Sequence, residues 1–206
     1  MGKIIKVSGP VVVAEGMSRA RMYDVVCVGE KRLIGEIIEL RGDRATIQVY
    51  EETAGIGPGE PVFPTGQPLS VELAPGLIGA VYDGIQRPLD IIRGIVGDYV
   101  TRGVSVEAVD RKKEWDFQPK SSKGAHVTQG DVLGVVKETE LVEHRVMVPV
   151  GLEGEVIDIH EGSAKVEDAI AKIKMKDGTK EVTMLQRWPV RIPRPFKEKL
   201  PPTIPM

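Results

Sequence analysis

Phosphate binding is the first chemistry to look for, because a short glycine-rich motif can supply all of it. A loop of the type Gly-x-x-x-x-Gly-Lys-Ser/Thr wraps phosphates with backbone amides and reaches their charge with its lysine. The only Gly-Lys pair is Gly2-Lys3, which is followed by Ile4. The glycine-rich stretch at 55–66 contains neither lysine nor arginine, and we expect it to form a surface turn. No nucleotide-binding residue is predicted.

Carboxylates and hydroxyls are the next candidates for catalysis. Adjacent or near-adjacent acids occur at Glu51 with Glu52 and at Glu36 with Glu39, but no partner for acid-base work accompanies them. We expect these four carboxylates on solvated strand or turn faces. No serine lies in a Gly-x-Ser-x-Gly elbow, so a serine nucleophile lacks its usual setting. No catalytic residue is predicted.

A metal site or disulfide also has little support. Cys27 is the only cysteine, and its apolar neighbours predict that it packs as a small hydrophobic side chain. The three histidines, His126, His144 and His160, share no ligand spacing with it. We therefore expect neither a metal ligand nor a cofactor within this chain.

Composition excludes further classes of function. The 28 basic and 30 acidic residues nearly cancel and form no long run of one sign, which argues against a nucleic-acid partner. The chain has only two Trp, four Tyr and three Phe, and they are not interleaved with basic residues as in a base-stacking surface. No stretch approaches the roughly 20 apolar residues of a membrane-spanning helix. We expect a cytoplasmic protein without direct membrane insertion.

The region from Lys3 to about Val71 has the pattern of an antiparallel barrel or sandwich. Short runs of β-branched residues alternate with turn residues, among them Gly42 within 41–44. At 46–49 apolar and polar residues alternate, which places Ile47 and Val49 on one buried face. The glycine- and proline-rich segment 55–61 is predicted to be a loop at the rim of the barrel.

The period changes to that of a helix between Ala74 and about Lys113. Pro75 suits a helix start, and Pro88 should end or bend that helix. Beyond Pro88 a helical spacing continues, weakened by Gly94 and Gly97. The residues at helical spacing are Leu77, Ile78, Val81, Tyr82 and Ile85 before Pro88, and Leu89, Ile92, Val96 and Tyr99 after it. A helix placed here is typical of the opening of a larger α/β domain.

The pattern returns to strands from about Glu114 to Arg187. Two glycine-marked segments, 124–136 and 146–157, resemble the folded sandwich of lipoyl- and biotin-carrier domains. In those carriers the hairpin between the segments presents a modified lysine. The corresponding residues here, 138–145, contain no lysine, and Lys137 at the edge lacks the flanking methionine. We therefore expect the carrier fold without the carrier chemistry, and a modified Lys137 remains a weaker alternative.

Several short strings, in a fixed order, carry a resemblance that spans nearly the whole chain. They are GPVV at 9–12, ARMY at 20–23, GEII at 35–38, QVYEET at 48–53, YDGIQRPL at 82–89, VEH at 142–144, VP at 148–149, WPVRIPRP at 188–195 and KL at 199–200. Together they resemble the N-terminal third of the catalytic A subunit of archaeal-type and vacuolar-type rotary ATPases. Two local departures are Gly124-Ala125, where the family usually has Gly-Asp, and Pro149-Val150-Gly151, where it often has Pro-Pro-Gly.

The resemblance implies a mainly β chain in four parts. Residues 1–72 would form an antiparallel β-barrel in the crown of the head, and 73–113 the helical start of an α/β nucleotide-binding domain. Residues 114–187 would form an inserted sandwich that protrudes from the head, and 188–206 a linker returning toward the nucleotide-binding domain. The proline-rich tail 200–206 itself has the composition of a linker.

The resemblance also implies partners and a limit on activity. The partners would be the B subunits of the A3B3 head and the subunits of the peripheral stalk, in a complex peripheral to the membrane. Mg-ATP is expected only for a full-length subunit, because the phosphate loop of the family would follow Met206. We therefore expect this chain to be one part of an ion-translocating ATPase and to be inactive on its own. The alternative is a stand-alone binding or assembly module.

Overall fold

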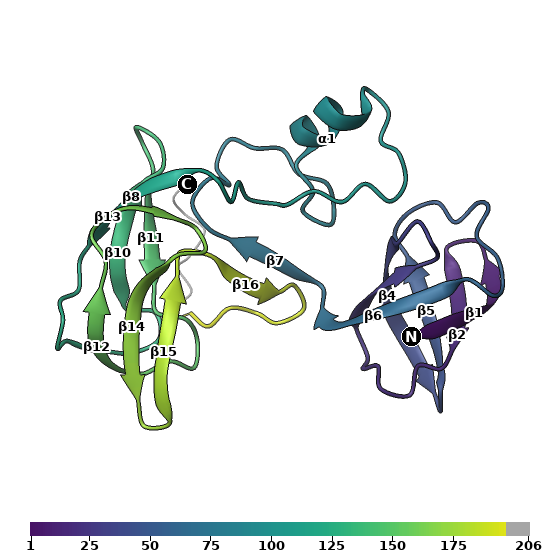
Figure 1. The fold of residues 1–206 in the computed structure, drawn as a ribbon, viewed down its shortest axis with the longest axis horizontal. Coiled ribbons are helices and arrows are strands. Elements are labelled where there is room, and N and C mark those ends of the chain that lie inside the picture. The colour runs from purple at the N-terminus through teal and green to yellow at the C-terminus, as the bar shows by residue number, and fades with distance from the viewer. Residues whose placement is uncertain (197–206) are drawn as a thin grey trace, which may run out of the picture.

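The computed structural model describes residues 1–196 and begins with a closed β-barrel (Figure 1). The strand order around the barrel is β1-β2-β5-β4-β3-β6, and β1 pairs with β6 to close it through Gly2 opposite Val62. Every pairing is antiparallel, as the turn pattern predicted. The strands are β1 (Gly2–Ser8), β2 (Val11–Glu15), β3 (Asp24–Val28), β4 (Leu33–Arg41), β5 (Arg44–Val49) and β6 (Pro61–Pro68).

Alternation along the strands fills the barrel interior. Ile47 is fully buried and Val49 is nearly so, whereas Gln48 between them is exposed, which confirms the predicted buried face. Gly42, with φ +63°, makes the tight connection between β4 and β5. The predicted loop at 55–61 lies between β5 and β6, but β6 already begins at Pro61 and contains Gly66. The expectation of a surface turn over all of 55–66 was therefore wrong for its second half.

A second unit is built from two four-stranded sheets. One sheet has the order β11-β10-β8-β13 and the other β15-β14-β12-β9, and Figure 1 shows the two facing each other. Their inward side chains form one core that includes Phe117, Leu133, Val156, Ile170 and Ile173, each at most 1% exposed. The strands are β8 (Glu114–Pro119), β9 (His126–Val127), β10 (Val132–Lys137), β11 (Glu143–Met147), β12 (Gly154–Ile159), β13 (Gly162–Lys165), β14 (Ala169–Met175) and β15 (Gly178–Thr183).

Two of the glycines that marked this sandwich in the sequence, Gly134 and Gly154, are places of close approach. A side chain at Gly134 would collide with the Phe117 ring, and one at Gly154 would collide with the carbonyl oxygen of Lys174 on the paired strand β14. Both positions have ordinary backbone angles, so the requirement for glycine is one of space.

We predict that Gly154→Ala destabilises the chain by about 1 to 3 kcal/mol, because backbone would have to move to admit the methyl group. The matched control is Gly94→Ala in the helix, where a Cβ meets nothing within 4 Å and should stabilise by roughly 0.5 to 1 kcal/mol. Urea unfolding of both variants checks this. Equal effects in the two variants would contradict the assignment of Gly154 to a packed strand contact.

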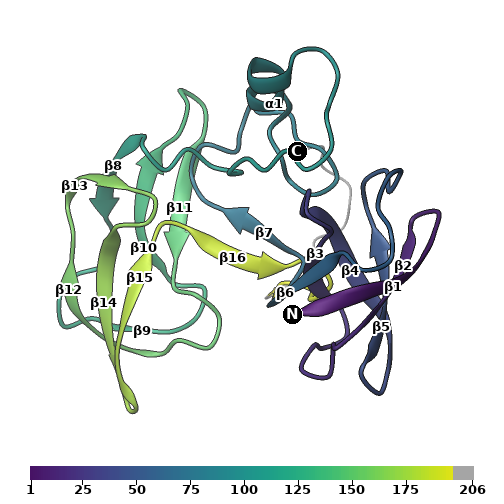
Figure 2. The same ribbon diagram turned by 45° about the vertical axis from the view of Figure 1, so that its right-hand side comes forward.

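A two-stranded sheet lies between the barrel and the sandwich (Figures 1 and 2). It pairs β7 (Ser70–Leu73), which follows the barrel, with β16 (Gln186–Pro189), which follows the sandwich. Its register places Trp188 opposite Val71. Segments more than a hundred residues apart in sequence therefore meet at the centre of the molecule.

The helical prediction is only half correct. The helix α1 (Leu89–Val96) begins immediately after Pro88 and ends at Gly97, which has φ +85° and donates its N–H to Arg93 O. The predicted helix before Pro88 was wrong, because that segment forms turns and a bridge between Tyr82 and Pro88. The helical spacing to Tyr99 likewise runs past the actual end of α1.

Local competition explains the missing helix. The Asp83 side chain accepts hydrogen bonds from the backbone N–H groups of Ile85 and Arg87. These bonds stabilise a turn, and a continuous helix could form here only if they were broken. Gly76 and Gly79 ahead of it adopt positive φ values. Among the described residues no helix is long and apolar enough to cross a membrane.

Candidate functional site: the junction between barrel, loop and sandwich

The loop at 82–89 is organised by a single carboxylate. Asp83 Oδ1 accepts the N–H of Ile85 at 3.1 Å and that of Arg87 at 2.8 Å, and Oδ2 accepts Arg87 Nε at 2.7 Å. These hydrogen bonds from Arg87 and Ile85 offset the effect of burial and hold the pKa of Asp83 below its usual range. Asp83 therefore stays ionised and fixes the direction of Arg87.

Gln86, next in the loop, covers the free edge of β7. Its side-chain Oε1 accepts the N–H of Glu72 at 2.6 Å, and its Nε2 donates to the Glu72 carbonyl at 2.8 Å. The amide thus replaces a neighbouring strand. Gln86 has φ +63°, an uncommon conformation for a residue other than glycine, and these two bonds account for its persistence.

Arg87 joins the loop to the barrel. Its guanidinium lies 3.6 Å from Glu51 Oε2 and donates to the carbonyl of Val104 at 3.0 Å. Glu51 also accepts the N–H of Gly103 at 2.8 Å. The side chains of Arg87 and Glu51 are only 12% and 8% exposed, so this is a largely buried contact among three separate segments.

The second string, at 188–195, is fastened to the barrel in a similar way. Arg191 Nε and Nη2 donate to the two oxygens of Glu36 at 2.9 and 2.5 Å, and the Tyr50 hydroxyl donates to the same carboxylate at 2.9 Å. The guanidinium also lies 4.7 Å from the centre of the Tyr23 ring. Glu36 is 2% exposed, and its charge is met by a partner 155 residues away.

A third ion pair brings in the sandwich. Arg111 Nη2 donates to both oxygens of Glu72 at 2.6 and 2.7 Å, and its Nε lies 3.0 Å from Glu167. Arg187 on β16 also reaches Glu72, at 3.2 Å. Glu72 on β7 therefore pairs both with Arg111, which lies just before the sandwich strand β8, and with Arg187 on β16.

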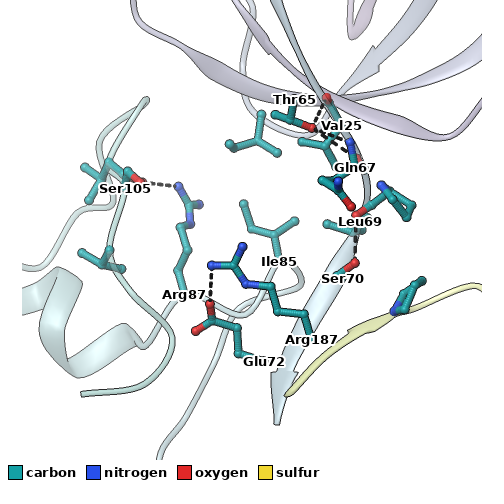
Figure 3. A pocket seen from close by; sticks show the side chains of 15 residues that line it. Val25, Thr65, Gln67, Leu69, Ser70, Glu72, Ile85, Arg87, Ser105 and Arg187 are labelled. Carbon is teal, nitrogen blue, oxygen red and sulfur yellow. Dashed lines mark hydrogen bonds and ion pairs between the residues drawn. The ribbon is translucent and has the colours of Figure 1, made fainter. Parts of the chain in front are cut away.

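These contacts surround a pocket of about 650 Å³ between the barrel and the loop (Figure 3). Figure 3 shows Arg87, Glu72 and Arg187 on one side and Val25 and Thr65 of the barrel on the other. Its apolar lining includes Val25, Ile34, Leu69, Ile85, Val104 and Val106. Both arginines in the pocket are already bonded to carboxylates, and no group of metal-ligating side chains occurs within residues 1–196. The arrangement holds segments together and has no assembled catalytic set.

Two of the carboxylates expected on solvated faces are in fact buried. Glu36 and Glu51 lie on or near the barrel surface, but each is covered by an arginine from a distant segment, so the prediction was wrong for both. It holds for Glu39 and Glu52, which are exposed or pair only with local groups. A local pattern cannot reveal a partner from the opposite end of the chain.

The remaining candidate residues are dispersed. Gly2 and Lys3 lie in β1, and half-buried Cys27 lies in β3. Lys137 ends β10 with Nζ 2.9 Å from Glu140, while the apex of the hairpin carries Leu141, which is 96% exposed. His126, His144 and His160 occupy three different parts of the sandwich, on β9, on β11 and after β12. The residues at 199–200 and the tail 200–206 lie outside the described residues.

Acid should weaken the contact between Glu36 and Arg191. The hydrogen bond from Arg191 is the main cause that holds the pKa of Glu36 below its ordinary value of 4.5. The folded protein then binds fewer protons than the unfolded chain, so this stabilisation is complete above pH 4.5 and is lost as pH falls through the folded pKa.

We predict that Glu36→Gln has a flatter dependence of urea midpoint on pH below 4.5 than the unchanged chain. Exposed Glu140→Gln serves as the control, since Glu140 makes only a surface pair with Lys137. Identical pH profiles for Glu36→Gln and the unchanged chain would contradict the role of Glu36.

Comparison with known proteins agrees with this architecture. Residues 4–66 match the beta-barrel domain of the ATP synthase alpha/beta family, and residues 106–191 match the ATP synthase alpha/beta subunit barrel-sandwich domain. The V-type ATP synthase alpha chain of Acetivibrio thermocellus is 60% identical over 206 residues, and that of Clostridium novyi is 58% identical over 205. The alpha chain of Clostridium botulinum strain Hall is also 58% identical over 205 residues.

These matches cover 100% of this chain and 35% of each relative, so the chain spans about a third of their length. They bear out both the family resemblance and the mainly β architecture. The chain belongs to the ATP synthase alpha/beta family and corresponds to the N-terminal portion of V-type ATP synthase alpha chains.

Proposed function

We propose that this chain is the assembly portion of a catalytic alpha chain, in which the barrel and sandwich are held in a fixed relation by the junction. The observation that carries the proposal is the pair of contacts that join the barrel to residues 87 and 191. Arg87 and Glu51 form a largely buried pair, and exposed Arg191 covers the buried carboxylate of Glu36. A junction of this kind resists independent motion of the two units. It would let contacts made by either unit constrain the rest of the subunit.

The partners in this proposal follow from the resemblance. The barrel, within residues 1–72, would meet the barrels of B subunits in the crown of the A3B3 head. The sandwich, within 114–187, would protrude from the head toward the peripheral-stalk subunits. The assembled complex would be cytoplasmic and peripheral to the membrane, and it would couple ATP synthesis or hydrolysis to proton or sodium ion transport.

The segment 73–113 is proposed to begin the nucleotide-binding domain. Helix α1 buries Ile92 but leaves Ile91 at 49% and Ile95 at 63% exposure, and the preceding turn leaves Val81 at 60%. An apolar surface of this kind is typical of a segment that is completed by further structure. We propose that the remaining two-thirds of the subunit covers it and that 188–206 leads back toward that domain.

The test of the non-catalytic assignment is calorimetric titration with Mg-ATP. Transferring phosphoryl groups requires cradling amides, a lysine and a bound magnesium ion. The sequence lacks the phosphate-loop motif, and residues 1–196 contain no group of metal-ligating side chains. We expect no saturable heat from this chain and no hydrolysis, while a full-length alpha chain from a relative, assembled with its B subunits, serves as the positive control. Micromolar binding by the chain itself would overturn the assignment.

A further inference from the structure

Residues 74–113, between β7 and β8, form what we call the connecting segment. A buried carboxylate outside the junction joins the sandwich to this segment. Glu138 follows β10 at the base of the β10–β11 hairpin, and its side chain is only 3% exposed. Its Oε1 accepts the backbone N–H of Gly76 at 2.7 Å and that of Ile78 at 2.9 Å. Figure 2 shows this hairpin rising beside the connecting chain. One side chain of the sandwich thus satisfies two backbone N–H groups of the connecting segment.

The other oxygen of this carboxylate faces an imidazole. Glu138 Oε2 lies 3.5 Å from His144 Nδ1, and the His144 side chain is 25% exposed. His144 is placed there by the register of the hairpin, in which it lies opposite Val136. Burial lowers the pKa of His144, and the neighbouring Glu138 carboxylate only partly opposes this effect.

The other charged or titratable groups around this contact come from residues 74–113, from the segment after the sandwich and from the hairpin itself. Tyr82 packs from the connecting segment, and burial raises the pKa of its hydroxyl, with Glu138 adding to the effect. Lys113 lies over the Trp115 ring, which packs beside Gly76. Arg194 lines the same small cavity as His144. The neighbours on the hairpin itself are Lys137, Glu140, Glu143 and Arg145.

We propose that Glu138 and His144 form a latch between the sandwich and the connecting segment, and that the latch loosens when His144 takes up a proton. A charged imidazole at a largely buried position requires water that the closed contact excludes. The open form, in which His144 is hydrated, therefore binds the proton more readily. The latch is fully stable above the ordinary histidine pKa of about 6.5 and weakens as pH falls through the lower folded pKa.

The direction of this effect sets the expected behaviour of the sandwich. At neutral and higher pH its hairpin holds the 76–78 turn, and at mildly acidic pH the turn is released while the barrel contacts remain. The latch consists of contacts within the chain and is separate from the proposed contacts with other subunits.

Hydrogen exchange of the Gly76 and Ile78 amides tests the latch on the intact chain between pH 5 and 8, after correction for intrinsic exchange. We expect protection at both amides to fall toward low pH relative to a barrel amide such as that of Val12. Glu138→Ala should lower their protection about tenfold or more at every pH, because both amides lose their acceptor. His144→Gln should keep the protection and lose its pH dependence.

Two further variants keep the test decisive. Glu138→Gln retains an acceptor oxygen and should preserve part of the protection if Glu138→Ala proves too unstable. His126→Gln is the matched control, since His126 is 66% exposed and pairs only with surface Glu153. An unchanged pH profile in His144→Gln, or full protection in Glu138→Ala, would overturn the proposal.

Discussion

Arg87→Met should destabilise the chain by about 3 to 5 kcal/mol, the range for removing one partner of a buried ion pair. Methionine keeps much of the stem but leaves Asp83 and Glu51 without their counter-charge, at 21% and 8% side-chain exposure. The Val104 carbonyl also loses its donor. Because these groups belong to three segments, we expect the loop at 82–89 and the attachment of the barrel to loosen together.

The measurement is equilibrium unfolding in urea, with Arg93→Met as the matched control. Arg93 lies on α1 and pairs with Asp98, but both side chains are more than 70% exposed, so the expected change is about 0 to 1 kcal/mol. A loss below 1 kcal/mol for Arg87→Met would mean that water already solvates the junction, and the account of a rigid connection would fail.

Phe117→Ala should cost about 3 to 5 kcal/mol, because the fully buried ring lies at the centre of the sandwich core and its removal leaves a cavity. Phe117 is on β8, which pairs with both β10 and β13, and the ring packs against Gly134, where no side chain can fill the space. The barrel has a separate core of its own. We therefore expect the sandwich to unfold first in this variant.

Tryptophan fluorescence can follow that step, since Trp115 is buried in the sandwich core and the barrel strands contain no tryptophan. The matched control is Phe63→Ala on the barrel strand β6, where the ring is only half-buried beside Arg32 and should cost less. In Phe117→Ala, loss of hydrogen-exchange protection at barrel amides such as that of Val12 at the same urea concentration as the change in tryptophan fluorescence would contradict independent cores.

The β architecture was predictable because it depends on local patterns. Alternation at Ile47 and Val49 and the glycines at turns such as Gly42 reflect contacts made within a few residues. The failed helix before Pro88 is of a different kind, because its apolar spacing was suitable but the Asp83 side chain captured the backbone amides.

The junction could not be predicted from spacing, since its members lie far apart in the sequence. Glu36 and Arg191 are separated by 155 residues, and Glu51 and Arg87 come together only after the barrel has folded. Only the resemblance drew attention to 82–89 and 188–195. The structure shows that both strings supply an arginine to a carboxylate of the barrel.

Native mass spectrometry of this chain, mixed with the B subunit of a close relative without nucleotide, tests the proposed assembly role directly. We expect complexes that contain both chains, and we expect them to be retained by Phe117→Ala and lost when residues 1–72 are removed from the chain. A chain that stays monomeric beside correctly folded B subunits, or complexes that survive loss of the barrel, would contradict an assembly role for this portion.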